Sequence, residues 1–177
     1  MTTFFKWTDH HLLSPYEQYD YIDDILAGKW LEPVDVDKTQ LCGVGYHVLR
    51  RGDLLKSYDT YAPYSCDLGD WDNCGGLLWQ VQIRDEFRYE TPETWTARRT
   101  TDKSVVPSFR FVRLAGFLPY AYLDAEMFEG NPAPDSNWTG KEVLTHLMSG
   151  EMVEHGLVMI RKLHRLEPTT DGKWRRF

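Results

Sequence analysis

The segment from residue 77 to residue 84 constrains the fold most, because apolar and polar side chains alternate along it. An extended chain places every second residue on the same side. Its apolar side would hold Leu77, Trp79, Val81 and Ile83, and its polar side Gln80, Gln82 and Arg84. We therefore predict a β-strand with one face in the core.

Other segments share this preference for extended structure, and together they predict an antiparallel sheet of roughly four to six strands. β-Branched and aromatic residues favour strands, and Pro33 would confine its segment to a sheet edge because proline has no N–H to donate. The further predicted strands are residues 31–36, 41–49 with a glycine turn at the start, 95–100, and 104–114, where Phe109 and Phe111 alternate with Arg110 and more weakly with Arg113.

A helix is predicted near the start of the chain. Ser14 would cap it, Pro15 would occupy its first position and Glu17 would complete the capping box. Apolar residues at three- and four-residue spacing would give it a buried face, and Gly28 would end it at about residue 27. The residues of that face are Tyr19, Ile22, Ile25 and Leu26.

The C-terminal part is also predicted to be helical. Thr139 and Glu142 repeat the capping pattern, and apolar spacing continues to about Arg165 with an interruption at Gly150. A short helix is predicted at residues 53–58. We expect the N-terminal and C-terminal helices to pack on the antiparallel sheet, which gives an α+β fold.

The length of 177 residues fits a single domain. Residues 1–128 would form the core that contains the sheet, and residues 129–138 a Pro-rich loop. Residues 139–166 would form the helical segment and residues 167–177 a basic tail. We therefore predict one domain over residues 1–177.

The cysteines and the apolar runs predict a cellular location. The chain has three cysteines, an odd number, and no export signal at its start, so we expect reduced thiols and a cytoplasmic, unprocessed protein. No run approaches the roughly 20 apolar residues of a membrane helix, so we expect no membrane partner.

Charge is spread unevenly along the chain, whose net charge is −7. Residues 1–40 carry eight acids against three lysines, and residues 161–177 carry six basic residues against two acids. An acidic total argues against nucleic-acid binding, because such binding depends on neutralising phosphates. The basic end could contact an anionic partner, although such an end is usually only solvated.

A candidate zinc site is the set of Cys42, His47, Cys66 and Cys74, which is numerically Cys₃His. Their spacing lacks the short C-x₂₋₄-C turn that preforms half of a tetrahedral site, so buried single thiols are favoured and no metal is expected. His10 and His11 would point apart. The remaining histidines, His146, His155 and His164, lie nine residues apart, which places successive rings on opposite sides of a helix.

One aromatic patch is a candidate ligand site. Tyr46, His47, Ser57 and Tyr58 would gather an imidazole, phenols and a hydroxyl near one strand end, where a planar ligand could stack. Ordinary packing of a strand against a helix explains the same residues and is favoured. No nucleophile elbow, phosphate-binding loop or dinucleotide glycine pattern is present, so no cofactor is expected.

Half of the chain, from about residue 28 to residue 117, resembles a family of small uncharacterised proteins of tailed phages and prophages. The pieces that carry this resemblance are GKW at 28–30, LCGVGYHV at 41–48, LWQVQI at 78–83, DK at 102–103 and FVRL at 111–114. It implies a phage-encoded accessory protein in the cytoplasm of the host cell.

A weaker resemblance is to the scaffold of ADP-ribosyltransferases. It is carried by the order of Gly45, His47, Ser57 and Tyr58, followed by the strand at 78–83. The resemblance implies a pocket for NAD, with Glu86 as a weak candidate for the catalytic acid. Glu86 lies earlier than the family pattern requires, and no clear basic motif precedes the glycine strand.

We therefore predict a non-enzymatic accessory protein that binds a host or phage protein, as an inhibitor of the host protein or a minor accessory component. The absence of catalytic motifs and the 14% of aromatic residues support this hypothesis. The predicted partner-binding residues are Tyr61, Tyr64, Trp174 and Phe177. The alternative is an NAD-binding or ADP-ribosyltransferase-like protein that uses the pocket of Gly45 and His47.

Overall fold

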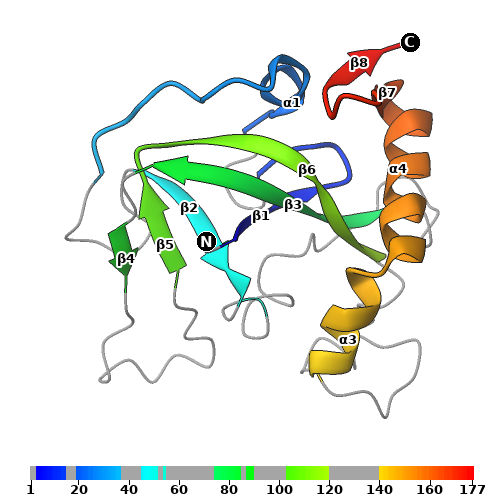
Figure 1. Cartoon of the computed structure of the whole chain (residues 1–177), viewed down its shortest axis with the longest axis horizontal. Coiled ribbons are helices and arrows are strands. Elements are labelled where there is room, and N and C mark those ends of the chain that lie inside the picture. Colours follow the sequence, from blue (N-terminus) through cyan, green and yellow to red (C-terminus); the bar gives the residue numbers. More distant parts are fainter. Residues whose placement is uncertain are drawn as a thin grey trace.

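The structure is a computed structural model, and it describes residues 3–14, 19–36, 45–51, 54, 74–84, 87–89, 103–119 and 140–177. Strands form a central sheet that helices and a small hairpin cover (Figure 1). The elements are β1 (Phe4–Asp9), α1 (Ile22–Ala27), β2 (Tyr46–Arg50), β3 (Gly75–Arg84), β4 (Phe87–Tyr89), β5 (Lys103–Val106), β6 (Ser108–Pro119), α3 (Gly140–Leu147), α4 (Gly150–His164), β7 (Leu166–Pro168) and β8 (Trp174–Arg176).

Among the described residues, the main sheet is antiparallel and has six strands in the order β4-β5-β2-β1-β3-β6. Consecutive strands β5 and β6 are separated only by Pro107, yet β5 pairs with β2 and β6 pairs with β3. The sheet must therefore curl so that β5 and β6, from opposite ends of the strand order, come together at Pro107. Strand twist favours such a curl. Antiparallel pairing and the α+β fold confirm the prediction from sequence.

The predicted strands agree with the sheet in part. Strand β3 contains the whole of residues 77–84, and β2 begins directly after Gly45, as predicted. The φ angle of Gly45 is 133°, and an added Cβ would lie 2.4 Å from Val105, so glycine is required there. The single strand predicted at 104–114 is wrong, because Pro107 divides it into β5 and β6. Residues 95–100 lie outside the described part.

Both faces of the sheet are apolar where other elements cover them. The larger core cluster joins the sheet to α1, α4 and the C-terminal hairpin, and its largest fully buried members are Trp79, Phe109 and Phe117. A second cluster lies on the opposite face, beneath α3. Its buried members are Phe5, Trp7, Leu49, Leu54, Leu78, Leu118, Leu144 and Leu147.

The N-terminal helix begins later than predicted. Ser14 is not its cap: the hydroxyl of Ser14 accepts from the N–H of Tyr19, and a β-bridge joins Leu13 to Asp20. The helix starts at Ile22, after Tyr21. Its end is confirmed, because Gly28 caps α1 in the left-handed conformation. Local capping chemistry was overridden by pairing between segments on either side of residues 15–18.

Residues 31–36 do not form the predicted edge strand. They run beside the free edge of β6, where the N–H of Leu31 donates to the carbonyl of Phe109 and the N–H of Val34 donates to that of Pro107. Pro33, between these two donors, has no N–H, so the bonds do not extend into a regular ladder. The segment nevertheless covers part of an otherwise open edge.

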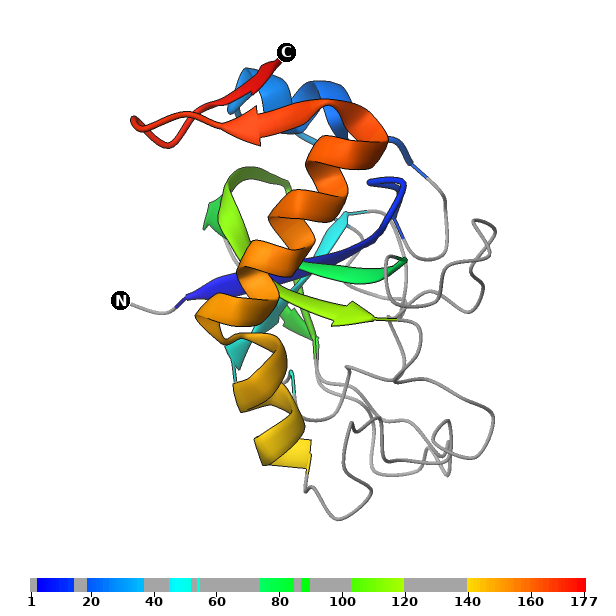
Figure 2. The ribbon, with the colours of Figure 1, turned by 90° about the vertical axis from the view of Figure 1, so that its right-hand side faces the viewer.

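The C-terminal helices follow the prediction closely. The predicted interruption lies between α3 and α4, where the hydroxyl of Ser149 accepts from the N–H of Met152 and caps α4. Helix α4 ends at His164, next to the predicted limit. Figure 2 shows α4 crossing the face of the sheet. Thr139, the loop 129–138 and, apart from Leu54, the helix predicted at 53–58 lie outside the described part.

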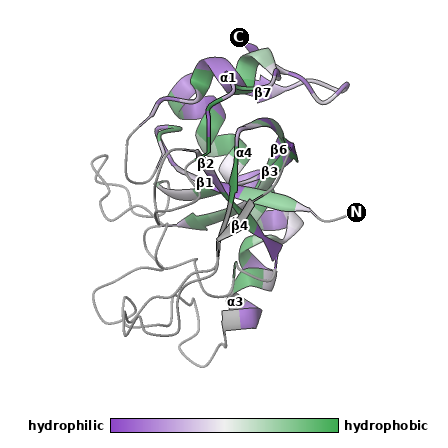
Figure 3. Ribbon diagram, turned by 90° about the vertical axis from the view of Figure 1, so that its left-hand side faces the viewer, coloured by the Kyte–Doolittle hydropathy of each residue, from purple (hydrophilic) through white to green (hydrophobic). Residues whose placement is uncertain are grey.

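The predicted basic tail is an ordered hairpin of β7 and β8. Trp174 is 9% exposed and its ring centroid lies 5.4 Å from that of Trp79, so this end of the chain joins the core. The hairpin lies beside α1, whose residues alternate between hydrophilic and hydrophobic in Figure 3. Among the described helices, none has the length and apolar character needed to cross a membrane.

Candidate functional site

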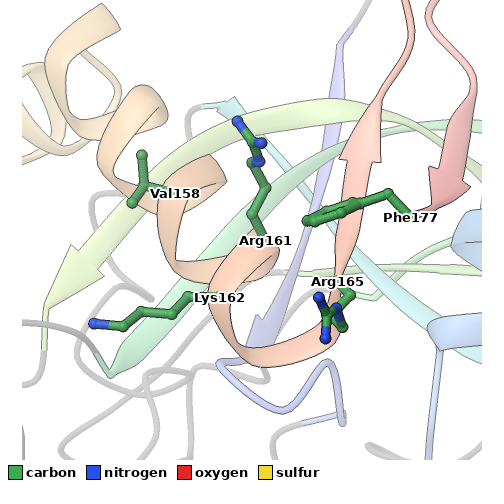
Figure 4. A pocket seen from close by; sticks show the side chains of 5 residues that line it. All are labelled: Val158, Arg161, Lys162, Arg165 and Phe177. Atoms are coloured by element: carbon green, nitrogen blue, oxygen red, sulfur yellow. The ribbon is translucent and has the colours of Figure 1, made fainter.

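An open pocket of about 680 Å³ lies on the surface where the last turns of α4 meet the end of the C-terminal hairpin (Figure 4). Two of its apolar side chains are half exposed, Val158 at 51% and Phe177 at 52%. The other lining residues are all cationic. The complete lining is Val158, Arg161, Lys162, Arg165 and Phe177.

The fold places Phe177 in this pocket through one backbone bond. Helix α4 stops because Arg165 takes the left-handed conformation, with φ of 56°. The carbonyl of Arg165 then accepts from the N–H of Phe177 at 3.0 Å. The guanidinium carbons of Arg161 and Arg165 lie 5.3 and 5.9 Å from the centre of the Phe177 ring, so the ring sits between two cations.

The pocket is only partly neutralised. The carboxylate of Glu167 lies 2.7 Å from Nη2 of Arg175 and 3.6 Å from Nε of Arg161, so one carboxylate forms ion pairs with two guanidinium groups. In the described part of the chain, no carboxylate forms an ion pair with Lys162 or Arg165. The site therefore keeps positive charge on a protein whose net charge is −7.

The lining chemistry suits binding. Guanidinium and ammonium groups donate hydrogen bonds and do not accept them, and no lining side chain carries a thiol, imidazole or carboxylate to act as nucleophile or base. Phe177 and Val158 add exposed apolar surface to these donors. The arrangement can hold an anionic group beside an apolar one.

The predicted partner-binding residues are separated by the structure. Phe177 is exposed and lines the pocket, whereas Trp174 lies in the core and has too little exposed surface to anchor a partner. The basic tail predicts that its two aromatic side chains, Trp174 and Phe177, are exposed. The sequence does not show that the hairpin buries one of them. Tyr61 and Tyr64 lie outside the described residues.

The predicted ligand patch is not assembled in the described part. Tyr46 and His47 are neighbours on β2 and so point to opposite faces of the sheet. The hydroxyl of Tyr46 donates to the carbonyl of Glu32 at 2.9 Å, its ring packs on Phe109, and burial raises its pKa. Ser57, Tyr58 and Glu86 lie outside the described residues, so the NAD pocket stays a prediction.

The cysteine predictions need a correction. Cys74 is buried and disulfide-bonded, so the expectation that all thiols are reduced is wrong. A sulfur in a disulfide is not a thiolate ligand, so Cys74 cannot serve in the Cys₃His set in this state. Cys42 and Cys66 lie outside the described part, within which no group of three metal-ligating side chains is found.

Sequence reasoning missed a group of three histidines. His164 Nε2 lies 2.8 Å from the carbonyl of His10, which makes that nitrogen a donor. The ring of His11 lies 4.3 Å from that of His10 and 6.5 Å from that of His164, measured between centroids. Burial lowers the pKa of His164, against the effect of its bond to His10. The chain separation of 154 residues left no local signal for this contact.

The turn that carries His10 and His11 is held by Asp9. Its carboxylate accepts from the N–H groups of His11 and Leu13, each at 2.9 Å. Burial nevertheless raises the pKa of Asp9. Nδ1 of His10 accepts from the N–H of Gly75, so the buried ring of His10 also has a structural role.

Comparisons with protein-family models, curated proteins and solved structures return no match for the chain. The resemblances to phage proteins and to ADP-ribosyltransferases stay predictions.

Proposed function

We propose that this protein acts without catalysis, by binding another protein through the pocket at the end of α4. The observation that carries the proposal is the exposed ring of Phe177 between the guanidiniums of Arg161 and Arg165. Aromatic and arginine side chains contribute most of the binding energy at protein interfaces. The resemblance to phage proteins supplies the setting, an accessory protein that inhibits a host protein or serves as a minor component.

The proposed occupant is an acidic protein segment with an apolar side chain between its carboxylates. Lys162 and Arg165 have no carboxylate partner among the described residues, so an acidic segment would complete their charge. The apolar side chain would pack against Phe177 and Val158. Charge complementarity of this kind speeds association and favours one class of partner.

The test is affinity capture from host lysate with matched variants. Phe177→Ala and Arg165→Gln should each weaken capture of an acidic protein at least about fivefold, the usual effect of truncating an interface anchor. Tyr19→Ala, which removes another half-exposed ring that does not line the pocket, and Lys141→Gln should leave capture unchanged. Capture that is equally strong with both pocket variants would refute the proposal, whatever protein is recovered.

A further inference from the structure

A second cationic surface lies on the exposed side of β3 and β6, away from the pocket. We call it the arginine face, and it consists of Gln80, Gln82, Arg84, Arg110, Arg113 and Trp30. The register sets Arg113 opposite Gln80 and Arg110 opposite Gln82. Nε of Arg113 donates to Oε1 of Gln80 at 2.7 Å, and Nε of Arg110 donates to Oε1 of Gln82.

A β-bulge brings the third arginine onto this face. Phe111 pairs with Val81 and Arg113 pairs with Gln80, so Val112 is an extra residue in β6. Without the bulge, strict alternation would place Arg110 and Arg113 on opposite faces. With it, both guanidiniums lie on the outer side, while Phe111 and Leu114 stay buried.

Trp30 completes the arginine face with a flat ring. The guanidinium carbon of Arg84 lies 3.9 Å from the centre of this ring, and that of Arg110 lies at 5.6 Å. The next residue, Leu31, donates its N–H to the carbonyl of Phe109 and so fixes Trp30 beside β6. The cations and the ring are thus held in place before any ligand arrives.

The arginine face has no internal counter-charge. The described part of the chain shows no ion pair for Arg84, Arg110 or Arg113, and each glutamine bond uses only Nε of its arginine. The terminal nitrogens of Arg110 and Arg113 therefore stay available as a pair of donors that match phosphate oxygens. Desolvating such donors is favourable only when an anion accepts them.

We propose that the arginine face binds single-stranded nucleic acid. Phosphates would accept from the guanidinium groups, and bases would stack on the layer formed by Trp30 and Arg84, as aromatic rings and guanidinium planes allow. Gln80 and Gln82 add amide groups that can bond to base edges. An acidic protein segment fits less well, because the flat layer of Trp30 and Arg84 matches a planar base better than it matches a branched apolar side chain.

The net charge of −7 limits this binding without excluding it. The guanidinium groups would contact phosphates directly, whereas charges more than about 8 Å away are largely screened at physiological salt. Three phosphate contacts predict that the logarithm of the binding constant falls with the logarithm of salt concentration with a slope of about −2. The affinity should therefore be modest and clearly measurable at low salt.

The test is fluorescence anisotropy of a labelled oligothymidylate over a range of salt concentrations. Arg110→Gln and Arg113→Gln should each reduce the steepness of the slope by about 0.7. Trp30→Ala should weaken binding at every salt concentration with the slope kept, because stacking is not ionic. Lys141→Gln, an exposed cation on α3, is the control, and thermal melting checks that each variant is folded.

Three results of the salt titration would overturn the proposal. They are no binding at low salt, an unchanged slope in both arginine variants, and a loss of binding on Arg165→Gln alone, which would place the contact in the pocket at the end of α4. Competition by polyglutamate as strong as that by unlabelled oligothymidylate would also contradict it, since the arginine face would then recognise anions without a preference for nucleotides.

Discussion

Trp174 packs against Trp79 with their ring centroids 5.4 Å apart. Trp79 belongs to the longest apolar alternation in the chain, and Trp174 belongs to a short hairpin at residues 166–176. This contact makes the hairpin part of the core and holds the neighbouring Phe177 beside α4.

Replacing Trp174 with alanine should destabilise the fold. The substitution removes a buried indole and leaves a cavity against Trp79, which typically costs about 3–5 kcal/mol of unfolding free energy. Urea denaturation measures the change. Phe177→Ala, at a half-exposed position, should change stability by less than about 0.5 kcal/mol. Equal losses in the two variants would contradict the burial of Trp174.

The buried hydroxyl of Thr8 should matter because it accepts a hydrogen bond from a buried indole and donates one to the carbonyl of Asp9. Nε1 of Trp79 donates to Oγ1 of Thr8 at 2.9 Å, and both residues are fully buried. Thr8→Val keeps the shape but leaves the indole N–H unpaired, at a cost of about 1–3 kcal/mol. Thr8→Ser keeps the acceptor and should cost about 0.8 kcal/mol for the lost methyl. If chemical denaturation gave Thr8→Ser a lower unfolding free energy than Thr8→Val, the result would argue against this bond.

Stability should fall as the pH drops below the ordinary pKa of histidine, near 6.5. Burial lowers the pKa of His164, so between the lowered value and 6.5 the unfolded chain binds more protons than the folded chain, and acid favours unfolding. Asp9 acts in the opposite direction, because its raised pKa costs stability at neutral pH, and this cost is relieved as the pH falls from the raised pKa to 3.8.

His164→Gln separates the two effects. Glutamine can still donate to the carbonyl of His10 but does not titrate. Thermal melting between neutral and mildly acid pH should show a smaller decline for the variant than for the wild type. Parallel declines would assign the pH dependence to other groups.

Gly75 should not accept a side chain. An added Cβ would lie 2.0 Å from the carbonyl oxygen of Leu118, on the neighbouring strand, and backbone atoms cannot yield as a flexible side chain can. We expect Gly75→Ala to cost about 3 kcal/mol or more. Gly150→Ala is the control, because nothing lies within 4 Å of its added Cβ and alanine favours helices. Comparable unfolding midpoints for the two variants would contradict the close approach.

Local patterns predicted the elements whose causes are local. Alternation over residues 77–84 identified β3, and Gly28 and Gly150 marked the end of one helix and the break between two others. The same reasoning failed at Ser14, because its hydroxyl accepts from the N–H of Tyr19 beside a β-bridge between Leu13 and Asp20, which local capping rules do not describe. It also failed at Pro107, where one apparent strand joins opposite sides of the sheet.

The candidate sites were less predictable than the fold. The basic C-terminal end and Phe177 could be read from the sequence, but the hairpin decided that Trp174 is buried and Phe177 exposed. The bulge at Val112 places Arg113 with Arg110 on the outer face. In the sequence, Arg113 fits the alternation of apolar and basic residues less well than Arg110 does. No local signal brought His164 to His10.

The strand and helix preferences and the α+β class follow from residues within a few positions of one another, and the uneven charge from their order, so all three can be predicted without the structure. Which side chains gather is set by the folded chain. Burial, the curl of the sheet and the register of β6 depend on contacts between segments far apart in the chain, and those contacts placed the pocket at the end of α4 and the arginine face.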